Sequence, residues 1–163
     1  MYSTGGERGG RWANKAIESD RVPARLVRHG QVGEELPKRL FPVFRDRDER
    51  ASAPELGHEI EAALRDARNL VVVCSPASAN SRWVNEEVRY FKSLGRADRV
   101  FCLIVDGEPG DAERECFPPA IRFLVADDGA LTDHPAEPVA ADARPDGDGR
   151  ANARLKLIAG MLG

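Results

Sequence analysis

Two apolar runs, residues 70–74 and 99–105, constrain the fold of this chain more than any other feature. Neither run alternates apolar with polar residues, so both predict strands that are covered on both faces. Strands of this kind occur in parallel sheets, and parallel neighbours need long connections that are usually helices. The two runs therefore predict an α/β protein with a buried parallel sheet.

Helices are predicted before, between and after these strands. A capping box at residues 52–55 begins one helix, and an earlier helix is expected at residues 11–19. Another is expected at about residues 80–94, closed by Gly95, and a short one at residues 120–124. A last helix from about residue 150 is expected to turn one apolar face inward, formed by Leu155, Ile158, Ala159 and Leu162.

The other strands are predicted to be short. Met1 and Tyr2 are typical of the end of a first strand, and the glycine-rich segment 3–10 is expected to be a loop. Residues 40–44 predict a second strand, and residues 127–148 are expected to be mostly loop with a short strand near Pro138 and Val139. The order of elements predicts one domain over residues 1–163, built on an open doubly wound sheet with helices on both faces.

Composition excludes several classes of partner. The formal net charge of −3 provides no basic field for nucleic acid or anionic lipid, and no run approaches the roughly 18 apolar residues of a membrane span. Three cysteines cannot all pair, and Cys74 and Cys102 lie within strand-like runs, which favours a cytoplasmic protein. The three histidines lack metal-like spacing and the cysteines form no paired C-x-x-C, so no metal site is expected.

Two adjacent glutamates on the helix at residues 80–94 have different neighbours. Glu86 has Arg82 four residues before it and Arg89 three residues after it, which is typical of a solvated charge with ion-pair partners. The residues three and four positions from Glu87 are apolar or aromatic: Trp83, Val84, Tyr90 and Phe91. A carboxylate in such surroundings is poorly solvated, and a cleft is the usual reason to tolerate it.

Nearly the whole chain resembles a bacterial Toll/interleukin-1 receptor (TIR) domain. The resemblance rests on residues 2–3, 41–46, 56–64, 70–76 with 81–88, 116–120 and 155–162. Its most specific part is the Trp-Val-x-x-Glu spacing of Trp83, Val84 and Glu87. The family implies a flavodoxin-like, mainly parallel five-stranded sheet. The chain departs from the family at its start, because only Met1 precedes Tyr2, so the first strand is either short or truncated from a longer protein.

The resemblance implies two alternative activities. Many bacterial members hydrolyse or cyclise NAD at the nicotinamide–ribose bond after self-assembly, in defence or signalling pathways, and the glutamate matching Glu87 is their catalytic residue. Here NAD is a substrate and no further cofactor is expected. Other members are non-catalytic interaction modules that associate with further TIR domains, and a fused or partner sensor domain is compatible with both. The product, linear or cyclic ADP-ribose, stays open.

Ligands of doubly wound sheets bind beyond the carboxyl ends of the strands. Three predicted loops leave those ends, at residues 3–10, 45–54 and 75–80. We therefore expect substrate contacts from these loops and from the helix of Glu87: Tyr2, Ser3, Thr4, Asp46, Arg47, Arg50 and Trp83. Each has an ordinary alternative: Trp83 as a core residue, the charged run 45–50 as a solvated face, and the glycine-rich segment as a flexible terminus. A metal-dependent receiver on the same fold class is disfavoured, because Ser3 and Thr4 supply no acids after the first strand.

Overall fold

The computed structural model describes residues 2–4, 54–126 and 128–162. Its elements, in chain order, are β1 (Tyr2–Thr4), α3 (Pro54–Asp66), β2 (Leu70–Cys74), α4 (Pro76–Asn80), α5 (Arg82–Ser93), the 3₁₀ turn η1 (Ala97–Arg99), β3 (Val100–Ile104), α6 (Pro119–Arg122), β4 (Phe123–Val125), β5 (Leu131–Pro135), β6 (Val139–Asp142) and α7 (Gly149–Leu162). The predicted helix 11–19, strand 40–44 and loop 45–50 lie outside the described residues, as do Ser52 and Ala53 of the predicted capping box.

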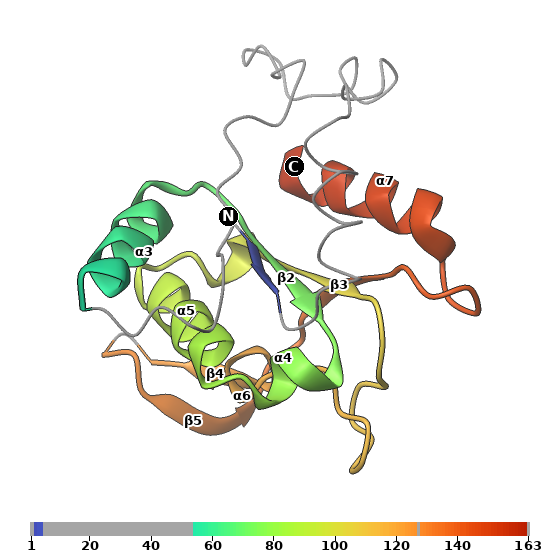
Figure 1. Ribbon diagram of the computed structural model, residues 1–163, viewed down its shortest axis with the longest axis horizontal. Helices are drawn as coiled ribbons and strands as arrows, with labels where there is room; N and C mark the ends of the chain where they lie inside the picture. The colour runs from blue at the N-terminus through green and yellow to red at the C-terminus, as the bar shows by residue number, and fades with distance from the viewer. Residues whose placement is uncertain (1, 5–53, 127, 163) are drawn as a thin grey trace.

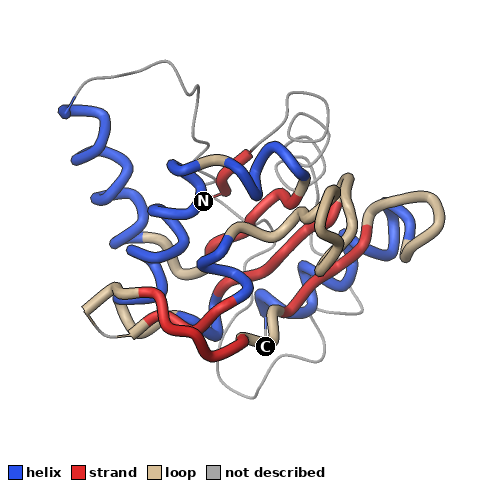
Figure 2. The backbone as a smooth tube through the Cα atoms, turned by 90° about the horizontal axis from the view of Figure 1, so that it is seen from below, coloured by secondary structure: helices blue, strands red, loops and turns tan. Residues whose placement is uncertain are grey.

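Four strands form a parallel sheet in the order β1-β2-β3-β6. The pairing is continuous, because Val71 is aligned with Tyr2 on one side and with Phe101 on the other. Helices α3 and α5 cover one face and α7 covers the other (Figure 1). In the turned view the strands lie side by side between these helices (Figure 2). The predicted doubly wound α/β fold is thus found, and four strands of its main sheet lie within the described chain.

Strand alternation divides the core into two clusters, one on each side of the sheet. Val71, Val73, Phe101 and Leu103 belong to the cluster under α7. Their neighbours in the same strands belong to the cluster under α3, α5 and α6: Leu70, Val72, Cys74, Val100, Cys102 and Ile104. All five residues of β2 and of β3 are buried. This two-sided burial explains why both strands are continuously apolar.

The helix predicted at about residues 80–94 is present as α5, and a separate short helix, α4, precedes it. Ser81 has extended backbone angles, φ −78° and ψ 117°, so α4 ends before it and α5 begins after it. The Ser81 hydroxyl accepts a hydrogen bond from the Val84 N–H at 3.4 Å and caps α5. A serine in this position satisfies a first-turn donor that a continuous helix would bond internally.

In the region after β3, the end of a predicted helix and the extent of a predicted loop are wrong. The predicted helix 120–124 ends at Arg122, and Phe123 begins β4, which pairs antiparallel with β5. Part of the segment predicted as mostly loop forms β5, which was not predicted, whereas the short strand predicted near Pro138 and Val139 is present as β6. The residues of β5 are half-buried or exposed, so this ribbon lacks the apolar run that identified β2 and β3.

The last helix is present, but its buried face is rotated from the predicted one. Ile158 is buried as expected, whereas Ala159 is exposed and Ala153, Leu157 and Met161 are buried instead. Gly160 explains the rotation of the buried face of α7, because a β-carbon at this position would lie 2.8 Å from Cε1 of the Phe101 ring. The missing side chain lets α7 approach the sheet along its glycine side.

Candidate active site

Helix α4 begins directly after the carboxyl end of β2, and two serines form its cap. The Ser75 N–H donates to the Ser78 hydroxyl at 2.8 Å, and the Ser78 N–H donates to the Ser75 hydroxyl at 3.3 Å. Ser78 also donates its hydroxyl proton to the Ser75 carbonyl at 2.8 Å. Both serines are buried, and this reciprocal capping fixes the angle at which the chain leaves the sheet.

Helix α5 places the two adjacent glutamates in different environments. Glu87 is buried, with 6% of its surface exposed, among the buried helix residues Val84, Val88 and Phe91. Glu86 is exposed and accepts hydrogen bonds from Arg89 at 3.1 and 3.3 Å. The predicted contrast between a solvated Glu86 and a buried Glu87 is therefore confirmed.

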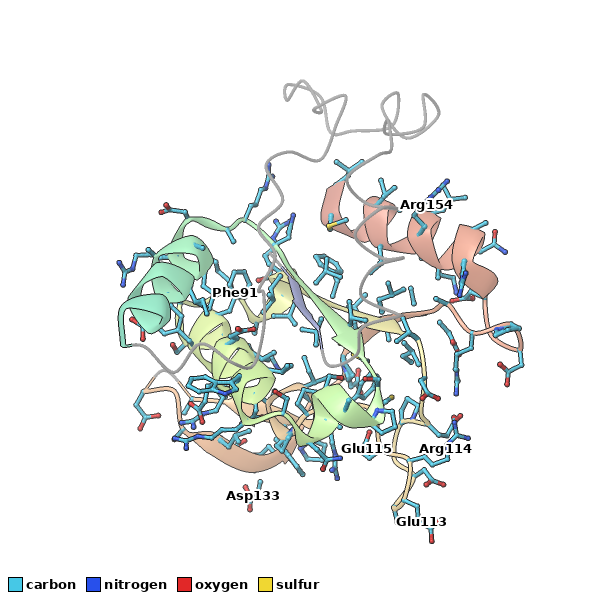
Figure 3. All side chains as sticks on the ribbon, viewed as in Figure 1. Phe91, Glu113, Arg114, Glu115, Asp133 and Arg154 are labelled. Atoms are coloured by element: carbon cyan, nitrogen blue, oxygen red, sulfur yellow. The ribbon has the colours of Figure 1, made fainter. Side chains whose placement is uncertain are left out.

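Trp83 lies one helical turn before Glu87 and is 56% exposed. Its interpretation as a core residue is wrong, because the apolar face of α5 is filled by other side chains. Phe91 points from α5 toward the sheet in Figure 3 and is fully buried. Trp83 offers a large exposed aromatic surface one helical turn from Glu87. Its role in substrate binding stays a prediction.

Polar side chains tie α5 to the elements on one flank. Asn85 Oδ1 accepts a hydrogen bond from the Ala120 N–H at 2.8 Å, and Lys92 Nζ donates to the Ala120 carbonyl at 2.6 Å. Arg89 donates from Nε and Nη2 to the Gly129 carbonyl, at 2.8 and 2.7 Å. The first two bonds reach α6, and the third reaches the turn between β4 and β5.

Arginines tie α5 and the turn after it to α3. Arg65 Nη2 donates to the Tyr90 hydroxyl at 2.9 Å. Arg96 Nη1 donates to the carbonyls of Arg65 and Ala67, at 2.8 and 2.7 Å. Helix α5 is thus bonded to neighbours on both flanks while its apolar residues pack on the sheet.

A separate ion-pair cluster joins the loops that follow β3 and β6. Arg144 donates to both Asp142 carboxylate oxygens, at 2.7 to 3.1 Å, to Glu108 at 2.6 Å and to the Gly107 carbonyl at 2.5 Å. These bonds hold the pKa of Asp142 below its ordinary value, chiefly through the Arg144 hydrogen bond. Figure 3 shows Glu113 and Arg114 on the loop that projects beyond this edge of the fold.

The other predicted substrate residues are placed only in part. Tyr2, Ser3 and Thr4 all lie in β1, paired with Val71, Val72 and Val73, so the strand extends two residues further than predicted. The predicted loop can therefore begin only after Thr4. Helix α5 packs beside β1, which brings this strand near the helix of Glu87. Asp46, Arg47 and Arg50 lie outside the described residues, and their roles stay predictions.

The contacts that Asn85, Arg89 and Lys92 make to other segments were not predicted from the sequence. Their spacing of four and three residues places them on one side of a helix, which is a detectable signal. Such a stripe is usually a solvated face, however, and its partners here are backbone groups 28 to 40 residues away. Among the described residues, no cluster of three or more His, Cys, Asp or Glu residues could hold a metal ion, and no helix could cross a membrane.

Comparisons with known proteins extend these observations. The family model for the TIR domain matches residues 27–129, more than half of the chain. An NAD(+) hydrolase, ApTIR from an Actinoplanes strain, is 31% identical over 99 residues, which cover 55% of this chain and 14% of that relative. The comparison with solved structures found no significant match. With a parallel α/β sheet and a family match over most of its length, the chain belongs to the TIR domain family.

Proposed function

We propose that this protein cleaves NAD at the nicotinamide–ribose bond, with Glu87 as the catalytic carboxylate. The burial of Glu87 carries the proposal, because a helix surface offers ample exposed positions and a buried carboxylate needs a reason. Family membership and the similarity to an NAD(+) hydrolase support the same activity.

The chemistry requires a negative charge in a site with little water. When the bond from ribose C1′ to the pyridinium nitrogen breaks, the bonding electrons leave with neutral nicotinamide and the ribosyl group becomes an oxocarbenium-like cation. A fixed carboxylate stabilises the developing cation and accepts hydrogen bonds from ribose hydroxyls. Water then adds to C1′ and releases a proton to give ADP-ribose, or an adenine nitrogen adds to give the cyclic product.

We assign supporting roles to the other predicted residues. Trp83, exposed beside Glu87, provides a surface on which nicotinamide or adenine can stack. The first strand contributes substrate contacts from Tyr2, Ser3 and Thr4. The dinucleotide or a neighbouring subunit is contacted by Asp46, Arg47 and Arg50. Homotypic TIR association would complete the cleft, so activity per molecule should rise with protein concentration.

The cellular setting follows from the same reasoning. The three cysteines are free and buried, which agrees with a reducing cytoplasm where NAD is available. Cleavage of a central metabolite suits a prokaryotic defence or signalling pathway, triggered by a fused or partner sensor domain. No nucleic acid, membrane, metal or additional cofactor takes part in the proposed reaction.

The adjacent glutamates provide a matched test of the proposal. Glu87→Gln keeps the shape of the side chain but removes the negative charge, and it should lower NAD cleavage by about 10²-fold or more. Glu86→Gln should retain the wild-type rate, because Glu86 is exposed and pairs with Arg89. Nicotinamide release and NAD consumption would be measured at high protein concentration and on a clustering surface. Equal rates for the two variants would contradict the role of Glu87.

The non-catalytic interaction module remains the alternative. It predicts that NAD neither disappears nor raises the melting temperature, since binding stabilises only a folded state with a site for the ligand. It also predicts concentration-dependent association that Glu87→Gln leaves intact. Sedimentation and a thermal melt with intact NAD would distinguish the two hypotheses.

A further inference from the structure

Helix α6 depends on α5 for its end groups. It contains only four residues, and its N-cap is Pro118, which has no side-chain acceptor. Asn85 of α5 supplies that acceptor by binding the Ala120 N–H at 2.8 Å. Lys92 of α5 binds the carbonyl of the same residue at 2.6 Å. Two side chains of α5, two turns apart, therefore hold both backbone groups of one buried residue.

Arg89 adds a third attachment between these two. Its Nε and Nη2 both donate to the Gly129 carbonyl, so the planar guanidinium is fixed in orientation and in position. Gly129 lies in the turn between β4 and β5, on a different segment from Ala120. The three attachments form a line along α5, because residues 85, 89 and 92 are four and three positions apart.

Burial of the Lys92 ammonium shows that this line is not an ordinary solvated face. Lys92 is half-buried, and desolvation lowers its pKa from the ordinary value. A positive charge is poorly placed there unless its hydrogen bond to the Ala120 carbonyl compensates for lost water. The attachment therefore favours one arrangement of α5 against α6, since sliding or turning the helix would separate the half-buried ammonium from its acceptor.

We propose that Asn85, Arg89 and Lys92 are positioning residues that fix the rotation of α5 about its axis and so hold Glu87 in its buried place. Glu87 is two residues from Asn85, about 200° around the helix, which places it on the opposite side. A small rotation that breaks the attachments would carry Glu87 sideways by a similar arc. This inference rests on the proposed function of Glu87 only for its catalytic consequence.

The primary test measures the exposure of Glu87 without using NAD. Carbodiimide coupling of carboxylates, quantified by peptide mass spectrometry at low conversion, should label Glu87 slowly and Glu86 rapidly in the wild type. In Asn85→Leu and Lys92→Met, labelling of Glu87 should rise about tenfold while labelling of Glu86 stays constant. Lys92→Arg keeps a cationic donor and should restore slow labelling.

A destabilised control separates positioning from general loss of stability. Ile158→Val removes a methylene group from the buried face of α7, on the opposite side of the sheet from α5, and should lower the melting temperature without changing a residue of α5. Its melting temperature should be matched to that of Lys92→Met by adding low urea. Fast Glu87 labelling in this control, or slow labelling in Asn85→Leu and Lys92→Met, would overturn the proposal.

Kinetics then link positioning to catalysis. If wild-type protein cleaves NAD, Lys92→Met should lower kcat about tenfold with KM nearly unchanged. A displaced carboxylate loses more stabilisation of the transition state than of the bound substrate. Lys92→Arg should recover most of kcat. An unchanged kcat together with fast Glu87 labelling would contradict the claim that the position of Glu87 controls the rate of NAD cleavage. Wild-type protein without NAD cleavage would contradict the proposed function, while the labelling result would still decide the positioning claim.

Discussion

At the scale of single residues, helical phase separates two side chains that are adjacent in sequence. Glu86 and Glu87 have the same chemistry, yet one is exposed and ion-paired and the other is buried. The difference was predictable because residues three and four positions away determine the surroundings of a helical side chain. Trp83 shows the limit of that reasoning: its own neighbours could not reveal that other residues fill the core.

The cysteines give a prediction at this scale. Cys74, Cys102 and Cys116 are all fully buried, and burial raises the pKa of Cys116 to about 12 and that of Cys74 well above its ordinary value. At pH 8 only about one Cys116 thiol in 10⁴ would be the reactive thiolate. Folded protein should therefore react slowly with a disulfide reagent, and three equivalents should react in urea. Rapid reaction of the folded protein would show that a thiol is accessible.

At the scale of elements, predictability followed the source of each element's stability. Strand β2 was predicted with its observed bounds because all five of its residues are apolar and buried. The ribbon of β4 and β5 was missed, since its pairing joins exposed or half-buried residues such as Val125 and Leu131. The buried face of α7 was also missed, because contact between Gly160 and Phe101 depends on tertiary packing. For the same reason, only the buried Glu87 of the candidate site could be predicted, and the attachments of α5 to Ala120 and Gly129 could not.

The cap of α4 gives a prediction for an element. Ser78→Ala removes the acceptor of the buried Ser75 N–H, so the free energy of unfolding should fall by about 1–3 kcal/mol. Ser93→Ala provides the control, because the Ser93 hydroxyl only donates to the Tyr90 carbonyl near the end of α5 and is half-buried. That variant should lose less than about 1 kcal/mol. Urea titrations of both proteins would measure the difference, and equal losses would argue against a structural role for the cap.

At the scale of the whole molecule, the sheet separates two packing layers. The cluster under α3, α5 and α6 includes the apolar residues of the helix that carries Glu87, whereas the cluster under α7 lies on the other face. The Arg144 ion pairs join the loops after β3 and β6 at the carboxyl edge. Stability of this edge therefore depends on charge, and stability of the two layers depends on apolar burial.

Acid should weaken the molecule through this edge. The hydrogen bond from Arg144 lowers the pKa of Asp142, and the hydrogen bond from Lys156 lowers the pKa of Asp148. Because the folded pKa values lie below the unfolded ones, the stabilisation is present above the ordinary value of 3.8 and is lost as pH falls through the folded values. Urea unfolding between pH 7 and pH 3 should show this loss.

Removal of the arginine tests the origin of the acid effect. Arg144→Leu should lower the free energy of unfolding by about 1–3 kcal/mol at pH 7, because it leaves Asp142 and the Gly107 carbonyl without this donor. It should also make stability depend less on pH below about 4. An unchanged acid profile in this variant would assign the effect to other carboxylates.

The two hydrogen bonds from α5 to the backbone of Ala120 have a consequence for sequence variation in this protein. Both groups that α5 holds there belong to the peptide backbone, which every residue type carries, except that proline lacks the N–H. Substitutions in α6 that fit the available space should therefore preserve this contact, whereas substitutions of Asn85 or Lys92 in α5 should remove it. Among natural variants, the sequence of α6 should vary more than the residues at positions 85 and 92 of α5.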